Sequence, residues 1–307
     1  MCYYKNKRYR DEAIVNKRGE KMTVVLSADR TCDLNEDLLL EFQVNTIPYH
    51  IHIGDREYID NVNITPPEIF QIYREKKVLP KTSAINTGEY LDYFRPWVEQ
   101  GHDILHFCLG GALSSSYQNC VLAGEELGHI YPINSCNLSG AIGLQIIDAR
   151  KMLADGMSAA AVQAYFNEHT GCYHGSFILD TLEFLHAGGR CSSVAALSAN
   201  LLSIKPCIVV DNSSGSMQVG KKYRGSLSKV LTKYVKDALA QYDDILTDKI
   251  FITYSSIDAD TVDLVRETIE SVMPFDRVME TKASCTISSH CGPNTLGILF
   301  ATKKPVK

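Results

Sequence analysis

Two hydroxyl side chains, Thr82 and Ser83, stand in front of a segment that we expect to be a helix. Asn86, followed three residues later by Glu89, fits a helix N-cap whose glutamate reaches back to the first turn. A helix N-terminus has unpaired backbone N–H groups and a positive dipole end, which favour a nearby anion. We therefore predict that Thr82 and Ser83 lie in the loop before this helix and bind an anionic group. An ordinary polar turn after Pro80 is the alternative.

A second loop that could hold an anion follows an apolar segment, residues 103–109, which we predict to be a buried strand. Gly110, Gly111 and Ser114 come next, and residues 117–127 have the pattern of a helix. A strand, a loop of glycines and hydroxyls, and a helix place an anion at the carboxyl edge of a parallel sheet. A tight turn with a serine cap is the alternative interpretation.

Polar residues in two other parts of the chain are further candidates for ligand binding. Asn134 and Ser135 end the next predicted strand, residues 130–133. His290 lies just before Gly292 in what we expect to be a sharp loop, where its ring could face a ligand. A surface histidine without a ligand is the alternative.

Several familiar kinds of site find no support in the sequence. Ser114 lacks the G-x-S-x-G surroundings of a hydrolase nucleophile, and neither phosphate-binding glycine motif is present. The ten cysteines form no C-x-x-C pair, so we expect no zinc site. His50 and His52 share one strand face, but no third ligand is apparent, and we expect both to face solvent. We therefore expect no catalytic residues, no cofactor and no metal.

Composition excludes some classes of partner. The 307 residues are 45% hydrophobic and carry a formal net charge of -5, so no general positive field attracts nucleic acid. The polar, basic start of the chain has no apolar signal region, and no stretch is long and apolar enough to cross a membrane. We expect a cytoplasmic protein with free, mostly buried thiols.

The order of strands and helices predicts an α/β protein of two unlike domains. Residues 1–21 read as a loosely attached arm. Strands alternate with helices over residues 22–170, including a helix from Asp33 to Phe42, which indicates a parallel, doubly wound sheet. Residues 171–307 mix hairpins and helices, including a small apolar helix over 194–202, and suggest an α+β layer.

Short motifs also recur along the chain in a specific order and spacing. They are Asp29 and Thr31 with Asp33-Leu34, Ile47-Pro48, Asp60, Thr82-Ser83 with Gly88-Glu89, Leu113-Ser114, Tyr117-Gln118, Ser135, Gly188-Gly189-Arg190, Ile204-Lys205-Pro206, Arg224-Gly225, and His290 with Gly292-Pro293 and Gly297. Taken together they resemble the DegV family of bacterial lipid-binding proteins, over about residues 22–301.

The resemblance implies a three-layer α/β/α domain with a parallel sheet and a two-layer α+β domain with a mixed sheet. A long-chain fatty acid would lie in a tunnel between the domains. In some relatives the protein is the acyl carrier for a separate fatty acid kinase, which phosphorylates the bound carboxylate. The carrier itself would have no complete catalytic site.

The same resemblance assigns roles to the candidate residues. Thr82, Ser83 and Ser114 would hold the head group, and His290 would approach it across the domain cleft. Gly110 and Gly111 stand where the family usually has serines, so their backbone N–H groups would supply contacts instead. Asn134, where an aspartate is common, and Ser135 complete the expected ligand-binding set, while Arg190 and Arg224 would surround the head group or face the kinase.

Two other classes of function remain open at the level of sequence. The hydroxyl-rich loops and His290 could act in acyl or phosphoryl transfer on a small substrate. The chain could also be a small-molecule sensor whose pocket no longer takes lipid.

Overall fold

The structure is a computed structural model that describes residues 24–193 and 204–305. The predicted arm, residues 1–21, and the predicted helix over 194–202 lie outside the described residues.

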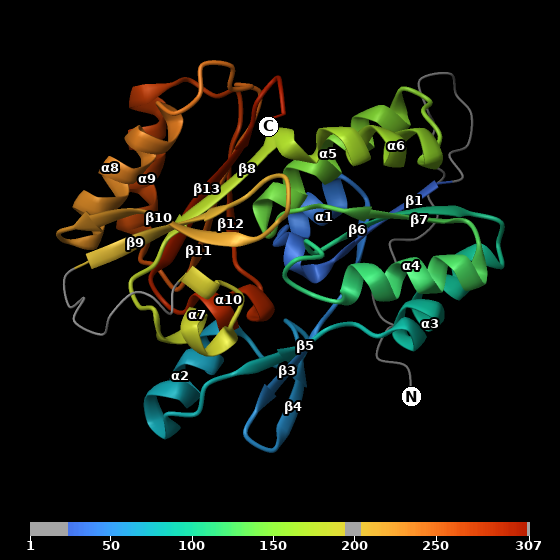
Figure 1. The fold of residues 1–307 in the computed structure, drawn as a ribbon, viewed down its shortest axis with the longest axis horizontal. Coiled ribbons are helices and arrows are strands. Elements are labelled where there is room, and N and C mark those ends of the chain that lie inside the picture. Colours follow the sequence, from blue (N-terminus) through green and yellow to red (C-terminus); the bar gives the residue numbers. More distant parts are fainter. Residues whose placement is uncertain (1–23, 194–203, 306–307) are drawn as a thin grey trace.

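The first half of the chain folds around a four-stranded parallel sheet in the order β2-β1-β6-β7 (Figure 1). Its strands are β1 (Val24–Asp29), β2 (Val44–Ile47), β6 (Asp103–Cys108) and β7 (Ile130–Asn134). Figure 1 shows helices α3 and α4 on one face and α5 and α6 on the other. The helices of this half are α1 (Glu36–Glu41), α3 (Thr87–Val98), α4 (Ser116–Leu127), α5 (Gly140–Ala154) and α6 (Ala159–His169). The predicted three-layer arrangement is confirmed.

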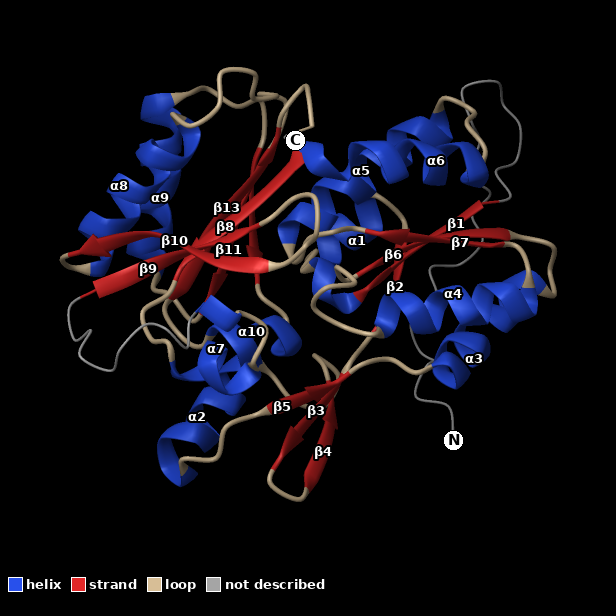
Figure 2. Cartoon of the chain, viewed as in Figure 1, coloured by secondary structure: helices blue, strands red, loops and turns tan. Residues whose placement is uncertain are grey.

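A small antiparallel sheet, in the order β4-β3-β5, extends from this half (Figure 2). It consists of β3 (His50–Ile53), β4 (Arg56–Ile59) and β5 (Lys81–Ser83), and helix α2 (Pro66–Lys76) packs with it. Thr82 and Ser83 are therefore strand residues and not loop residues, which corrects the prediction. The reason is pairing with a distant strand, because Thr82 lies opposite Ile51 and Ser83 opposite His50.

The second half is built on a mixed six-stranded sheet in the order β10-β9-β8-β13-β11-β12. Its strands are β8 (Tyr173–Ile178), β9 (Ile204–Val210), β10 (Met217–Arg224), β11 (Ile250–Ser255), β12 (Val278–Lys282) and β13 (Thr295–Ala301). Its helices are α7 (Glu183–Gly188), α8 (Leu227–Leu239), α9 (Ala259–Val272) and α10 (Cys285–Cys291). Apolar side chains of α8 and α9 cover one face of this sheet, as an α+β layer requires.

Helix α5 joins the two larger sheets through one continuous core. Two of its glycines make the close approach possible. A Cβ on Gly140 would lie 3.0 Å from Cβ of Phe251 on β11, and one on Gly143 would lie 2.9 Å from Cδ2 of Leu34. These glycines therefore set how closely the helix packs against both neighbours.

Two local predictions differ from the structure. The helix predicted from Asp33 begins at Glu36, because Asn35 caps it and Asp33 itself adopts a left-handed conformation after the short 3-10 helix Arg30–Cys32. His290 was expected in a sharp loop, but it lies in the last turn of α10. The turn comes two residues later, at Gly292, whose φ is +75°.

Two expectations about the whole chain can be compared with the described residues. Every described cysteine is a free thiol, and all but Cys136 are buried, as predicted. None of the described helices combines the length and apolarity that crossing a bilayer requires.

Candidate functional site

A cavity of about 260 Å³ lies between the two halves of the chain. Much of its wall is apolar, with Leu109, Leu113 and Leu138 from the first half and Phe177 and Leu299 from the second. The polar members of the lining include Thr82, Ser114, Ser115, Arg190 and His290. The cavity therefore combines an apolar wall with a small set of hydrogen-bond donors, as binding sites for amphipathic molecules do.

Thr82 and His290 come from opposite halves of the chain and meet at the cavity wall. Thr82 Oγ1 lies 2.8 Å from Nε2 of His290. Successive side chains of a strand point to opposite faces, so Ser83 points away from the cavity. There its Oγ lies 2.7 Å from Nε2 of His52, on the exposed side of the small sheet. Of the two predicted hydroxyls, only that of Thr82 lines the cavity.

The imidazole of His290 is neutral near pH 7. Burial, aided by the nearby charge of Arg190, lowers its pKa to about 4. Its Nδ1 atom is buried without a hydrogen-bond partner. A Cβ on Gly188 would collide with this atom, so the glycine makes room for the ring. The position of His290 is thus fixed by Thr82 on one side and Gly188 on the other.

The motif Gly188-Gly189-Arg190 closes helix α7 beside the cavity. Gly189 caps the helix with a φ of +66°, a conformation that favours glycine. Arg190 then folds back, with Nη1 donating to the carbonyl of Gly188 at 2.6 Å and Nε reaching the carbonyl of Leu113 at 3.5 Å. Arg190 is exposed and lines the cavity, so its positive charge lies at the opening.

Ser114 can offer a proton to a ligand because its neighbours act as donors to it. The backbone N–H of Ser116 donates to Ser114 Oγ at 3.2 Å, and the two hydroxyl oxygens are 3.0 Å apart. Ser116 Oγ accepts from the N–H of Ile85. When Ser116 donates its hydroxyl proton along this chain, the proton of Ser114 is left for a ligand in the cavity or for the Tyr49 hydroxyl oxygen, 3.4 Å away.

A buried ion pair supports this side of the cavity. Oδ1 of Asp29 accepts from the Tyr90 hydroxyl at 2.6 Å and lies 3.1 Å from Nε2 of His106. Oδ2 accepts from the Tyr49 hydroxyl at 3.0 Å and from the N–H of Leu109 at 2.8 Å. Tyr49 and Leu109 both line the cavity. Asp29 therefore fixes part of the cavity wall from within the core.

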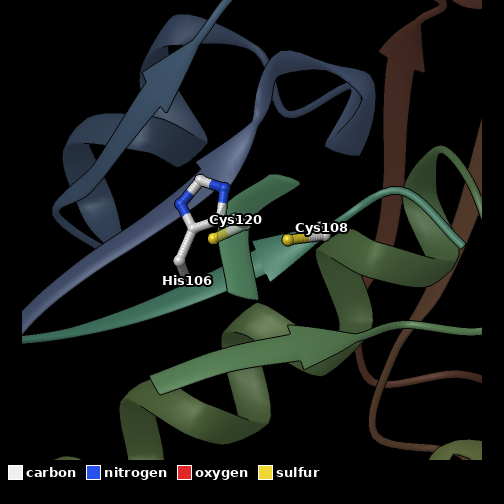
Figure 3. Close-up of side chains that lie close together, drawn as sticks. All are labelled: His106, Cys108 and Cys120. Carbon is white, nitrogen blue, oxygen red and sulfur yellow. The ribbon is translucent and has the colours of Figure 1, made fainter. Parts of the chain in front are cut away.

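His106 belongs to the one group of described residues whose spacing could suit a metal ion, together with Cys108 and Cys120 (Figure 3). Their candidate ligand atoms all lie within 4.8 Å of one another. However, Nδ1 of His106 is engaged with Ser27 and Nε2 with Asp29. Metal ligation would require a free ring nitrogen, so the hydrogen bonds do not fit a bound metal.

The protonation states of this group point the same way. Burial raises the pKa of both thiols, so they are protonated in the metal-free protein and a metal ion would have to displace both protons. Burial alone would lower the pKa of His106, but the hydrogen bond and the negative charge of Asp29 raise it. Because the thiol is neutral, Asp29 supplies the negative charge that this imidazolium needs.

The other residues predicted to bind the ligand from loops form hydrogen bonds between those loops and do not line the cavity. The N–H of Gly110 donates to the carbonyl of Asn137 at 2.9 Å, and the N–H of Gly111 donates to Oδ1 of Asn134 at 2.9 Å. Ser135 Oγ donates to the carbonyl of Asn137. Neither glycine amide is therefore free for an anion in this structure, and none of these residues lines the cavity.

Three more predicted positions lie away from the cavity. Arg224 is exposed at the end of β10. His52 lies beside Ser83 and is partly exposed. We expected His50 to face solvent too, but it does not. Its Nδ1 is 2.6 Å from Glu57 and its Nε2 is 2.5 Å from Glu89, and its side chain is 19% exposed. Two carboxylates that approach from neighbouring elements hold it in place.

Sequence reasoning missed several residues of the cavity wall. Tyr49 directly follows the Ile47-Pro48 motif, and Ser115 follows Ser114, so both lie next to residues that the sequence had already indicated. Ser255 and Thr286 gave no local signal, because the sheet and helix α10 bring them to the cavity from distant parts of the chain.

Residues 23–303 match the family described as "Uncharacterised protein, DegV family". The chain belongs to the DegV family. A DegV domain-containing protein of Clostridium perfringens is 30% identical, over 92% of this chain and 99% of the relative. The resemblance inferred from the motifs is therefore confirmed.

Solved structures of DegV proteins share the fold. A DegV family protein of Thermus thermophilus, described as binding fatty acid, superposes with a TM-score of 0.82 at 27% identity, over 92% of this chain and all of the other. A DegV lipid-binding protein of Thermotoga maritima gives a TM-score of 0.80 at 24% identity, over 93% of this chain. The fold of two unlike α/β parts is thus that of the DegV family.

Proposed function

We propose that this DegV protein binds a long-chain fatty acid, with the acyl chain in the cavity and the carboxylate at Thr82, Ser114 and His290. The observation that carries the proposal is an apolar cavity whose polar residues include the Thr82–His290 pair and Arg190. The Thermus thermophilus relative, described as binding fatty acid, shares the fold at 27% identity and supports it.

Burial of the acyl chain would supply most of the affinity. At ~0.8 kcal/mol per methylene, about 14 methylenes would contribute on the order of 11 kcal/mol before association costs. A hydrogen bond to a charged group adds roughly 1.5 to 3 kcal/mol. The head-group contacts would therefore set selectivity for a carboxylate more than they set total affinity.

Four groups can hold the carboxylate in this arrangement. Arg190 brings a positive charge to the opening, while Thr82 and Ser114 bring hydroxyl donors. The neutral imidazole of His290 can donate from Nε2 once a ligand competes for Thr82. A carboxylate needs such partners because burying it unpaired is costly.

We also propose that the protein acts as a carrier for a separate kinase. Such a kinase would transfer a phosphoryl group from its nucleoside triphosphate to a carboxylate oxygen of the bound acid, giving an acyl phosphate and the diphosphate. Arg190 and Ser115 line the cavity and are exposed, so the head group would lie near the surface. A phosphorylated product that forms only when kinase and carrier are both present would support this step.

The two alternative functions have less support. Acyl or phosphoryl transfer with His290 as the base would be helped by a third group that orients the imidazole, but Nδ1 of His290 has no hydrogen-bond partner among the described residues. A sensor that had lost lipid would be expected to fill its cavity with bulky side chains, whereas about 260 Å³ is open.

Mass spectrometry of ligand extracted from the purified protein tests the proposal directly, with a delipidated sample as the control. We expect stoichiometric fatty acid. If the protein is empty and also rejects added fatty acids, the proposal is wrong.

A second experiment tests the position of the head group. Titrations of Thr82→Ala and His290→Ala with a fatty acid and with its methyl ester separate the carboxylate from the acyl chain. Both variants should lose affinity for the acid by about tenfold while binding the ester as before. Unchanged affinity for the acid would place the carboxylate elsewhere.

A further inference from the structure

Helix α10 is short and carries His290 in its last turn, so its orientation decides where the imidazole lies. A helix of seven residues is not stable by itself, so contacts with its surroundings fix its position. Ser255 Oγ donates to Ser288 Oγ in its middle, and a larger set of hydrogen bonds holds its start. Its first turn is held by side chains more than 200 positions away in the chain.

Asp60 makes most of this attachment. Its Oδ1 accepts from the N–H of Cys285 at 2.7 Å. Its Oδ2 accepts from the N–H of Thr286 at 2.9 Å and from the Thr286 hydroxyl at 2.5 Å. Asp60 is 1% exposed, so water does not compete for these bonds. Three donors therefore converge on one buried carboxylate at the start of α10.

The position of Asp60 links α10 to the sheet that carries Thr82. Asp60 follows β4, and its own N–H donates to the carbonyl of Tyr49, just before β3. Strand β3 pairs with β4 on one side and with β5, which carries Thr82, on the other. The same small sheet thus presents Thr82 directly and holds the helix of His290 through Asp60.

We infer that Asp60 is a positioning residue, which sets the Thr82–His290 pair and through it the selectivity of the cavity for a carboxylate. This inference rests on the proposed function. Asp60 is not among the residues that line the cavity, so any effect on ligand selectivity would have to act through α10.

A neighbouring aspartate offers a matched control. Asp33 also accepts an N–H at the start of α10, from Ser284 at 2.9 Å, and its other oxygen accepts from the Ser139 hydroxyl at 2.6 Å. An asparagine at position 33 can keep the first bond and donate its amide to Ser139, since a hydroxyl can reverse its role.

The same exchange at position 60 cannot be accommodated. Both oxygens of Asp60 accept backbone N–H groups, so either orientation of an asparagine amide would face a donor that cannot reverse. Asp60→Asn should therefore move α10, whereas Asp33→Asn should leave it in place.

The experiment measures the ratio of affinities for a long-chain fatty acid and its methyl ester in Asp60→Asn, Asp33→Asn and the unmodified protein. Asp60→Asn should lower this ratio about tenfold through weaker binding of the acid, and Asp33→Asn should not change it. In a His290→Ala background, Asp60→Asn should produce no further loss. An unchanged ratio in Asp60→Asn, or an equal loss with and without His290, would overturn the inference.

If Asp60→Asn does not fold, Thr286→Val replaces it, because this change removes one of the three bonds to Asp60 and keeps the side-chain shape. Thr286 also lines the cavity, so this variant is measured in the His290→Ala background as well, where a loss that acts through α10 disappears and a direct loss persists. Thr286→Val should lower the ratio in the same direction. The ring signals of His290 in nuclear magnetic resonance spectra of the ligand-free protein provide an independent measurement. They should shift in either variant, and signals that stay unchanged would contradict the inference. An unmodified protein that binds neither ligand would instead refute the proposed function.

Discussion

At the scale of single residues, the structure places a neutral imidazole against a hydroxyl, with a guanidinium at the opening of the cavity. Burial and Arg190 lower the pKa of His290 to about 4, so the ring is uncharged in the empty protein near neutral pH. An anionic ligand would reverse part of this effect, because a nearby negative charge favours the imidazolium. Ligand binding and protonation should therefore be coupled at this residue.

Binding of a fatty acid below neutral pH should take up a proton. A carboxylate beside His290 raises the pKa of the ring, so affinity should increase as the pH falls through this raised value and level off near pH 4, the pKa of the ring in the empty protein. Calorimetric titration at pH 6 in buffers with different ionisation enthalpies measures the number of protons. His290→Gln should abolish the uptake and His129→Ala, an exposed histidine, should keep it. Equal uptake by all three proteins would show that the proton binds elsewhere.

Gly188→Ala should weaken binding of the acid by about tenfold. The new methyl group would collide with Nδ1 of His290 and push the ring away from Thr82. Gly124→Ala in α4 is the matched control, because a Cβ there would meet only ordinary contacts at 3.4 Å or more. Comparison of acid and methyl ester affinities checks the effect. Normal binding by Gly188→Ala would show that the ring has room to move.

At the scale of elements, features that depend on neighbouring residues were predicted well, whereas pairings between distant segments were not predicted. The capping box of Asn86 and Glu89 lies within four residues and forms as expected. That Thr82 belongs to a strand depends on pairing with β3, about thirty residues earlier, which no local pattern reveals.

Helix α10 shows the same limit more strongly. It begins at Cys285, after Ser284, whose side chain caps it by accepting from the N–H of Ile287. Asp33 and Asp60, more than 200 positions earlier, accept further N–H groups at its start. The sequence therefore identified His290 as a candidate but predicted the wrong local structure for it. The motifs had already included Asp33 and Asp60, without indicating what these residues bind.

Asp33→Asn should make the stability of the fold less dependent on pH. Burial raises the pKa of Asp33 from 3.8 to about 7, so the folded protein holds this proton more tightly than the unfolded chain. The resulting stabilisation is complete below pH 3.8 and is lost as the pH rises to about 7. The slope is at most about 1.4 kcal/mol per pH unit.

Urea unfolding from pH 5 to pH 8 measures this difference. The unmodified protein should lose stability relative to Asp33→Asn as the pH rises. The difference between the two proteins reports Asp33 together with its electrostatic interaction with the nearby Asp60. Parallel curves would mean that Asp33 does not titrate in this range.

At the scale of the whole molecule, the parallel sheet, the mixed sheet and helix α5 share one core, and the cavity lies between the two halves. The regular alternation of strands and helices in the first half was enough to predict its parallel sheet. The cavity could not be predicted in detail, because its wall joins residues from β5, α10, β11 and β13. The division of the chain at residues 170 and 171 stays a prediction.

Lys249→Met should lower the free energy of unfolding by about 3 kcal/mol. Lys249 is 5% exposed and lies 2.7 Å from Asp148 of helix α5, so its removal takes away the nearest positive charge of that carboxylate. Asp148 then keeps only the Tyr173 hydroxyl, at 2.9 Å, and the more distant Lys151, at 3.9 Å. Lys151→Met, which removes a lysine that is 59% exposed, should change stability by less than about 1 kcal/mol. Urea unfolding compares the two variants, and adding Asp148→Asn to Lys249→Met should restore part of the loss. Equal effects of the two lysine variants would contradict this assignment.

The tight packing of α5 has a consequence for how such a protein can evolve. Gly140 and Gly143 set the spacing between this helix and its neighbours, and neither position has room for a side chain. Residues of the cavity wall such as Leu299 or Phe177 can exchange for others of similar size without disturbing that spacing. Descendants of one ancestor could therefore come to prefer different acyl chains by small steps, while both glycines remain under constraint throughout.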